Sequence, residues 1–360
     1  MNADDASTVQ PSRRRLLCAT AGAAALAALP AQRAFATTPT QPDATPRVDF
    51  LSPQAGAAAF AQAGDTYYAN MGLIEIRARM RAPLAGLPLA DARAAVRAYD
   101  AGRVLAFTDD EREALHGVVS RMQPLLLARA PLYARTPWSF IKLDDAAEGG
   151  MPHTRGPHIV LPKAVTEGVA AMHREMKEAG KLAVTPRGRG LLLHEQTHVL
   201  ERADPARFEP LITDVFGFTR MTPAPTTAWL DAHVGTNPDG PDLAWAFALE
   251  QIGGKGWIMP VVTLPDVAVP RMPDDFQTPG LDVRRTDAGW KIAEKDGVPT
   301  SRDLDKIAGY HAHFPFPDED FHPNEIAAVT LSHWILQDVP DLDKRPGMRA
   351  VEAWAKRALA

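Results

Sequence analysis

Two histidines and a glutamate near the middle of the chain have the spacing of a metal-binding helix. His194, Glu195 and His198 form the pattern His-Glu-x-x-His. Side chains four residues apart project from one face of a helix, about one turn apart, so both imidazoles can reach a single tetrahedral cation. Glu195 then points beside the cation, where its carboxylate can take a proton from a metal-bound water. The pattern predicts a zinc-dependent hydrolase with one zinc ion per chain and Glu195 as its general base.

A catalytic zinc site with two histidines needs a third protein ligand. Glu325 is the best candidate, since it is the only acidic or basic side chain, histidine excluded, between Pro323 and Gln337. Pro323 suits the first turn of a helix, and on that helix Glu325 shares its face with small and apolar residues. A carboxylate buried on such a face is costly unless it is paired or bound to a metal. We therefore expect Glu325 to complete the site.

The two motifs together resemble the gluzincin group of zinc metallopeptidases. In that group a distal helical glutamate follows the His-Glu-x-x-His helix, and Asn324-Glu325 repeats the Asn-Glu pair of its thermolysin-like members. The resemblance is limited to these short motifs. Val329 stands where those enzymes have an aspartate that orients a histidine, and the segment between the motifs is much longer here. The resemblance implies a zincin-like fold, a peptide or protein substrate, and hydrolysis of peptide bonds.

Other acidic side chains could supply the third ligand instead. Glu201 lies on the same helical face as the two histidines, but its short offset favours pairing with an arginine or support of a histidine. Asp239 ends a Gly-Thr-x-x-Asp sequence similar to that of aspartate-ligated zincins, yet it lies far from the metal helix and its composition favours a turn. Further candidates without a supporting pattern are Glu209, Asp214 and Glu250.

A hydrolase of this kind also needs a donor for the negative charge that develops on the carbonyl oxygen. Tyr310, His311 and His313 lie in a polar and aromatic segment before the predicted Glu325 helix. We choose Tyr310 as the catalytic donor. The alternative is that Tyr310 is a packed aromatic residue and that the two histidines lie at the surface.

Two other functions are compatible with the motif. A zincin-like protein of the cell envelope could bind zinc or act as a scaffold without catalysis, and a metal-free structural protein could contain the pattern by accident. Glu195 favours the enzyme, since a site that only holds zinc has no chemical need for this carboxylate.

The N-terminal segment has the features of an export signal. Residues 12–17 resemble a twin-arginine signal, residues 18–30 form an alanine-rich apolar core, and Ala34-Phe35-Ala36 fits a cleavage site. We expect a signal peptide over residues 1–36 and a linker over 37–51, with a mature protein that is periplasmic or secreted. The single cysteine, Cys18, lies in the signal, which excludes disulfides and thiolate ligands from the mature chain.

Charge and hydropathy indicate which classes of molecule the protein is expected to bind. The formal net charge is −5 and the chain after the predicted signal has no basic run, so nothing favours binding to nucleic acid. No apolar run after the signal reaches the roughly 18 residues of a membrane-spanning helix, so no stable membrane insertion is expected. The expected partner is a peptide or protein substrate, and the sequence carries no signal for an oligomeric state.

The elements that must position these residues are helices and short strands. Apolar residues three and four apart predict helices in both halves of the chain, and Thr108 to Glu111 form a capping box before one of them. Residues 157–161 could be an edge strand that aligns an extended substrate beside the metal helix. The predicted helices cover residues 53–63, 89–100, 109–127, 163–179, 190–202, 206–216, 323–336 and 347–359, and the predicted strands cover 138–143, 158–161, 243–251, 257–263 and 289–294.

The expected fold class is α+β. A mostly helical N-terminal lobe with a small sheet, residues 52–203, includes the metal helix at mid-chain. A mixed α/β C-terminal lobe, residues 204–360, carries the third ligand.

Overall fold

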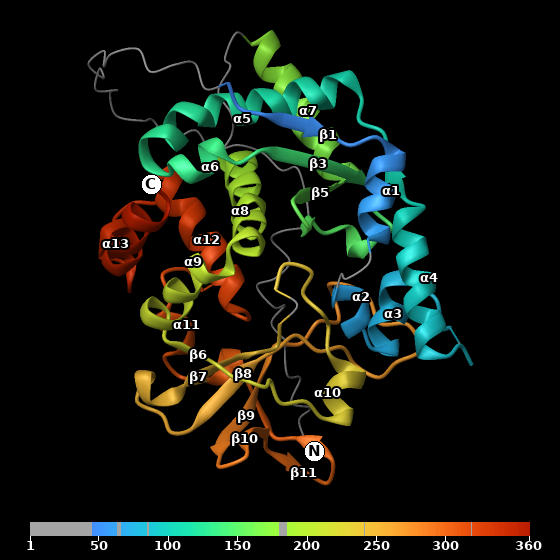
Figure 1. Ribbon diagram of the computed structural model, residues 1–360, viewed down its shortest axis with the longest axis vertical. Helices are drawn as coiled ribbons and strands as arrows, with labels where there is room; N and C mark the ends of the chain where they lie inside the picture. Colours follow the sequence, from blue (N-terminus) through green and yellow to red (C-terminus); the bar gives the residue numbers. More distant parts are fainter. Residues whose placement is uncertain (1–44, 63–65, 85, 180–185, 241, 318) are drawn as a thin grey trace, which may run out of the picture. The chain divides into compact units, whose positions relative to one another are not determined.

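The structure of the protein is a computed structural model. It describes residues 45–62, 66–84, 86–179, 186–240, 242–317 and 319–360. The predicted signal peptide lies outside these residues, as does most of the predicted linker. Residues Thr45–Ala360 form one compact unit with helices and strands in both halves, which confirms the α+β class (Figure 1). Among the described residues, no helix has the length and apolar character needed to cross a membrane.

A five-stranded sheet forms the centre of the N-terminal part. Strand β3 pairs in parallel with β1 and β5 and antiparallel with β2, while β4 pairs antiparallel with β5 and is an edge strand. All residues of β3 are buried, as expected of a central strand covered on both faces. The strands are β1 (Val48–Phe50), β2 (Val104–Leu105), β3 (Trp138–Leu143), β4 (His153–Arg155) and β5 (His158–Pro162).

Two strand assignments differ from the sequence-based prediction. Residues 157–161 were expected at a sheet edge, but β5 is an interior strand, and the edge belongs to the shorter β4. Residues 48–50, placed in the linker, form β1 instead, because their main chain pairs with β3. Both differences arise from pairing between distant segments, which local periodicity does not encode.

Helices cover this first sheet on both faces. Lys142 of β3 contacts Glu111 of α5, and α5 packs against α7 on the same side (Figure 1). Ile141 and Val160 face the other way and share a core with Phe60 of α1 and Val96 of α4. The helices are α1 (Pro53–Ala61), α2 (Thr66–Asn70), α3 (Leu73–Met80), α4 (Leu89–Ala101), α5 (Asp109–Arg129), α6 (Pro131–Arg135) and α7 (Lys163–Glu178).

A second sheet, antiparallel throughout, follows in the C-terminal half. Its strand order is β10-β9-β8-β7-β6, with β13 also paired to β9, and the strands predicted over 243–251 and 257–263 contain its β7–β8 pair. The strands are β6 (Phe218–Arg220), β7 (Trp245–Ala248), β8 (Trp257–Pro260), β9 (Pro279–Thr286), β10 (Gly289–Ile292) and β13 (Ser301–Asp303), and a separate pair is β11 (Glu294–Lys295) with β12 (Val298–Pro299).

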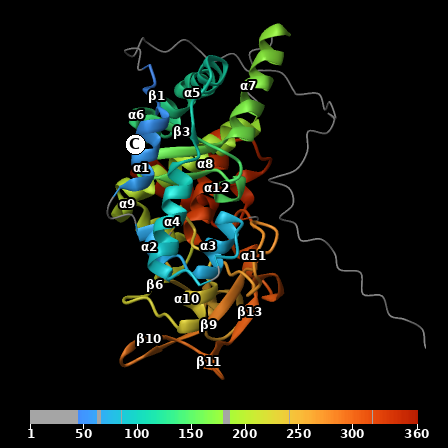
Figure 2. The ribbon, with the colours of Figure 1, turned by 90° about the vertical axis from the view of Figure 1, so that its right-hand side faces the viewer.

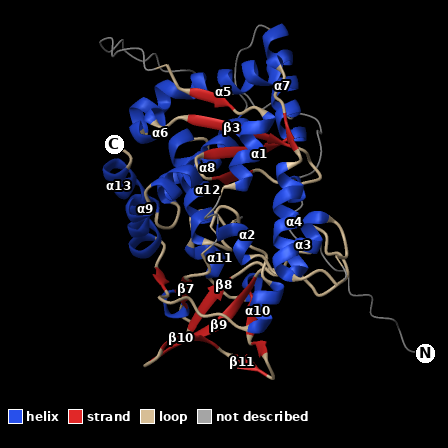
Figure 3. Ribbon diagram, turned by 45° about the vertical axis from the view of Figure 1, so that its right-hand side comes forward, coloured by secondary structure: helices blue, strands red, loops and turns tan. Residues whose placement is uncertain are grey.

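Helices α8 and α12 lie side by side between the two sheets, as the views in Figures 2 and 3 show. The largest apolar core surrounds them and includes Phe140 of the first sheet, Phe247 of the second and Trp354 near the C-terminus. The two predicted lobes therefore share one core. The remaining helices are α8 (Pro186–Ala203), α9 (Pro205–Pro210), α10 (Ala228–His233), α11 (Tyr310–His313), α12 (Pro323–Leu336) and α13 (Met348–Ala358).

Candidate metal centre

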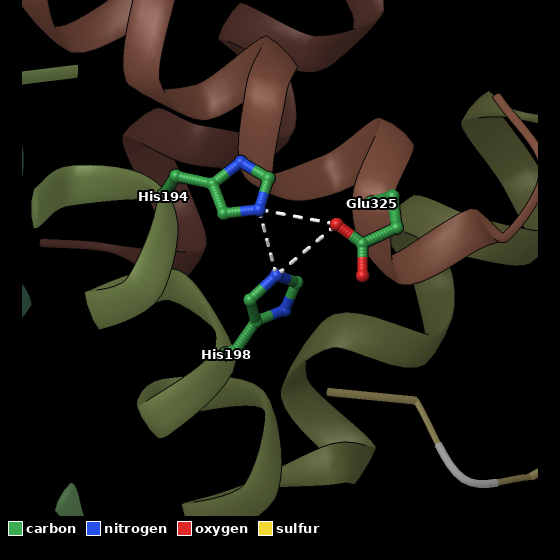
Figure 4. Close-up of side chains that lie close together, drawn as sticks. All are labelled: His194, His198 and Glu325. Atoms are coloured by element: carbon green, nitrogen blue, oxygen red, sulfur yellow. Dashed lines mark hydrogen bonds and ion pairs between the residues drawn. The ribbon is translucent and has the colours of Figure 1, made fainter. Parts of the chain in front are cut away.

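The predicted metal helix is α8, and it passes through the interior of the protein. Leu193 and Val199 are buried in the main core, while His194 and His198 point toward Glu325 of α12 (Figure 4). The ring centroids of the two histidines are 4.8 Å apart. His198 is fully buried and the side chain of His194 is 20% exposed, so solvent reaches the pair from the side of His194.

Glu325 lies in the first turn of α12. His322 is the N-cap of this helix, since its Nδ1 accepts a hydrogen bond from the main-chain N–H of Asn324 at 3.3 Å. Its Nε2 donates to the main-chain oxygen of Asp242 at 3.2 Å, which fixes the ring. The Glu325 carboxylate therefore projects from a capped helix end, where the helix dipole favours negative charge.

Three ligand atoms converge between the two helices, as Figure 4 shows. Oε2 of Glu325 lies 3.1 Å from Nε2 of His194 and 3.5 Å from Nε2 of His198, and the two Nε2 atoms are 3.1 Å apart. Ligands held about 2.0–2.1 Å from a tetrahedral zinc lie about 3.3–3.4 Å from one another. The cluster thus has the size and the donor set of a site that could hold a metal ion.

The supporting contacts of His198 come from Glu201 and Asn324, and of these only support by Glu201 was among the predicted possibilities. Its Nδ1 lies 2.9 Å from Oε2 of Glu201, one turn further along α8, and Asn324 donates to the same oxygen from 3.0 Å. A carboxylate at Nδ1 holds the proton on that nitrogen and leaves the Nε2 lone pair directed at the cluster. Glu201 therefore orients His198 and is not a member of the cluster that could hold a metal ion.

A loop from the C-terminal half holds the other oxygen of Glu325. Nδ2 of Asn237 donates to Oε1 at 2.6 Å. This residue lies in the Gly-Thr-Asn-Pro-Asp segment that the sequence favoured as a turn. The segment is a turn, since Oδ1 of Asn237 accepts from the N–H of Asp239, but its contact with the cluster had no sequence signal.

The charges of the cluster oppose the effect of burial. Burial acts to lower the pKa of His198, yet Glu325, Asp239 and Glu201 outweigh it and raise that pKa well above its ordinary value. Burial acts to raise the pKa of Glu325, and the two histidines hold it well below the usual range. A cation bound here would displace the proton between these groups, so metal binding and pH are linked.

Glu195 is a buried acidic residue near the cluster. Its side chain is 3% exposed, and its Oε2 has no hydrogen-bond partner among the described residues. Burial raises its pKa well above the ordinary value, and the nearby carboxylates of Asp239 and Glu325 raise it further. A buried carboxyl group with a free oxygen and a raised pKa is equipped to accept and return a proton.

The structure does not support Tyr310 as a donor to substrate. Its side chain is fully buried against Phe247 and Phe314, and its hydroxyl donates to the main-chain oxygen of Asp320 at 2.9 Å. That position agrees with the alternative of a packed aromatic residue. His311 also contacts Asp320, while His313 packs against Phe247.

The rival third ligands lie in other environments. Asp239 is buried, and its Oδ1 accepts from the N–H and the hydroxyl of Thr154 at 2.8 and 2.6 Å. Asp214 accepts from the hydroxyl of Thr213, and Glu250 accepts from the N–H of Gly256 at the surface. Within the described part of the chain, the metal-capable cluster consists of His194, His198 and Glu325.

Comparison of this chain with protein families, curated proteins and solved structures finds no match. Its function is therefore argued from the geometry of the cluster and from the sequence motif.

Proposed function

We propose that this protein is a zinc-dependent peptidase. The observation that carries the proposal is the convergence of Nε2 of His194, Nε2 of His198 and Oε2 of Glu325 near Glu195, whose Oε2 has no hydrogen-bond partner among the described residues. Two imidazole nitrogens and one carboxylate oxygen are the donor set of catalytic zinc sites that keep one position open. A peptide substrate and a zincin-like fold follow from the resemblance to the gluzincin motifs.

In the proposed reaction, the zinc ion, Glu195 and Glu201 have different roles. Zinc, when bound, supplies the Lewis acidity that polarises a substrate carbonyl and makes water more acidic. Glu195 takes a proton from the attacking water and passes it to the leaving amine, so the water's OH joins the acyl carbon and its hydrogen joins the nitrogen. Glu201 holds the ring of His198, and the side of the cluster at His194 is the one open to solvent.

The proposal extends to where the protein acts. The twin-arginine-like segment and the cleavage motif at Ala36 support export to the periplasm or the outside of the cell. Zinc is the proposed cofactor, with one ion per chain.

The first test compares metal content and peptidase activity in the parent and two variants. We expect about one zinc per chain in the parent and a large loss of zinc in Glu325→Ala. Glu195→Gln should keep its zinc and lose activity on a fluorogenic peptide library by roughly 100- to 10,000-fold, because it removes the base alone. Glu250→Gln, at an exposed site away from the cluster, is the matched control and should resemble the parent.

The zinc content tests the metal site, and the activity of Glu195→Gln tests the catalytic role of this residue. A parent chain that takes up no zinc, even after incubation with the metal, would remove the metal site. Full activity in Glu195→Gln would leave a zinc protein whose function is not catalysis through this residue.

A further inference from the structure

Residues 235–239, here called the 235–239 loop, connect three distant parts of the protein. Thr236 contacts Glu75 of α3, Asn237 contacts Glu325 of α12, and Asp239 contacts Thr154 of β4. The loop is thus hydrogen-bonded to other elements both before and after Asn237, which contacts Glu325 of the metal cluster.

Asn237 gives the two oxygens of Glu325 different environments. Oε1 accepts from Nδ2 of Asn237 at 2.6 Å, while Oε2 faces the two histidine nitrogens. The terminal torsion of a glutamate is broad, so the carboxylate plane is not fixed by the side chain itself. A donor on Oε1 restricts that plane and keeps Oε2 directed at the cluster.

The loop is anchored before Asn237 by a buried ion pair. Glu75 accepts from the N–H of Thr236 at 3.0 Å and from its hydroxyl at 2.8 Å, and Arg79 donates to the main-chain oxygen of Thr236 at 2.9 Å. Glu75 and Arg79 are buried and bond to each other. Because breaking such a pair is costly, the position of Thr236 is tightly held.

The loop is also anchored after Asn237. Asp239 is bonded to the main chain and hydroxyl of Thr154, and Arg202 of α8 donates to the main-chain oxygen of Pro238. At Gly240 a Cβ atom would lie 2.3 Å from the ring of His322, so the backbone packs directly on the cap of α12. Asn237 is therefore held in place relative to both ligand-bearing helices.

We propose that Asn237 is a positioning residue of the metal centre, which sets the orientation of the Glu325 carboxylate through Oε1 and thereby tightens the binding of zinc. This inference rests on the proposed function to the extent that it requires zinc at His194, His198 and Glu325. It assigns the loop a role beyond that of a turn.

The test measures zinc affinity and the geometry of the site in the full chain. Asn237→Ser removes the donor to Glu325 but keeps an oxygen that can accept from the N–H of Asp239. The comparison variant is Thr236→Val, which removes a side-chain bond to Glu75 from the same loop and keeps the donor to Glu325, so it measures how far zinc affinity depends on loop anchoring alone. Zinc affinity is read by competition with a chromophoric chelator, and ligand geometry by the visible absorption of the cobalt-substituted protein.

We expect Asn237→Ser to weaken zinc binding roughly 10- to 100-fold and to change the cobalt spectrum, whereas Thr236→Val, which keeps the donor to Glu325, should lose clearly less affinity. Parent-like affinity and spectrum in Asn237→Ser would overturn the inference and leave the proposed function intact. Equal losses in both variants would also overturn it, because they would show that loop stability and not the bond to Glu325 matters. A parent that binds no zinc would overturn the proposed function and this inference together.

Discussion

The carboxylate of Glu201 is buried between the ring of His198 and the amide of Asn324. Its own pKa is raised by burial, an effect that the hydrogen bond and the charge of His198 oppose. The negative charge beside Nδ1 makes the imidazole a stronger ligand at Nε2 and fixes its orientation. The affinity of the site for metal should therefore depend on a residue that does not touch the metal.

We expect Glu201→Gln to weaken zinc binding by roughly tenfold or more, since the neutral amide is a poorer partner for the Nδ1 proton. The measurement is the dissociation constant for zinc by chelator competition. Glu209→Gln, on the following helix α9 and outside the cluster, is the control and should keep the parent value. An unchanged constant in Glu201→Gln would show that His198 does not need this partner.

At this scale the sequence predicted the residues that follow a local rule. His194 and His198 share a helical face by their spacing, and Glu325 was the only acidic or basic side chain, histidine excluded, of the predicted helix. The structure brings the three side chains together, so their convergence is confirmed. That they bind zinc stays a prediction. Asn237 could not be predicted, because its contact depends on where a loop lies in three dimensions. Tyr310 was chosen for its nearness in sequence to the Glu325 helix, and nearness in sequence does not fix which way a side chain points.

Among the elements, α5, β3 and α7 are joined by one buried carboxylate. Oε1 of Glu111 accepts from Lys142 at 2.6 Å and from Thr166 at 3.0 Å, while Oε2 accepts from the N–H of Thr108 as part of the capping box. Burial acts to raise the pKa of Glu111, but these hydrogen bonds, led by the one from Lys142, lower it below the ordinary value. The ionised form is thus favoured by folding.

The depressed pKa predicts how this contact responds to acid. A carboxyl group whose pKa is lower in the folded state than in the unfolded state stabilises the fold at pH values above its unfolded-state pKa, about 4.3 for glutamate. This stabilisation is lost as the pH falls through the folded-state pKa. We expect Glu111→Gln to lower the free energy of unfolding by about 3–5 kcal/mol at pH 7, because Lys142 is left buried without its partner. Urea unfolding at several pH values should show that this difference shrinks below about pH 4.3.

The control for that experiment is Glu167→Gln on α7. The Glu167 side chain is 56% exposed and forms a surface ion pair with Lys163 at 3.8 Å. Such a pair contributes about 0–1 kcal/mol, so the variant should follow the parent at every pH. A constant difference between the parent and Glu111→Gln across the acid range would contradict the assignment of the ionised form.

Element boundaries were predictable where caps and breakers mark them. The helix over 323–336 was predicted with the bounds that α12 has, because Pro323 suits a first turn. In the structure, Gln337 ends this helix in a left-handed conformation. The helix predicted over 206–216 is shorter and passes into a π-helical turn at Leu211–Val215, where Pro210 removes a main-chain donor. Strand order was beyond prediction, since it depends on which segments pair.

For the whole molecule, the metal site would act as a link between its two halves. One ligand-bearing helix belongs to the predicted N-terminal lobe and the other to the C-terminal lobe, and both lie in the shared core. A ligand that binds only the folded state raises stability, by about 2.7 kcal/mol when its concentration is a hundredfold above Kd. Zinc is therefore expected to stabilise the entire described unit.

Calorimetry with and without a chelator measures this effect. We expect the chelator to lower the Tm of the parent and added zinc to restore it. Glu325→Ala should melt at one temperature under both conditions, apart from any loss that the substitution itself causes. A parent Tm that responds to neither chelator nor zinc would contradict a metal link between the halves.

The distance along the chain between α8, which ends at Ala203, and α12, which begins at Pro323, has a consequence during synthesis. Both histidines leave the ribosome long before Glu325 is translated, so a nascent chain carries only part of the site. Contacts of such long sequence separation form late in folding, because the loop between them must close first. Tight zinc retention would then be a property of completed chains alone, and a stably bound ion would distinguish finished molecules from truncated ones.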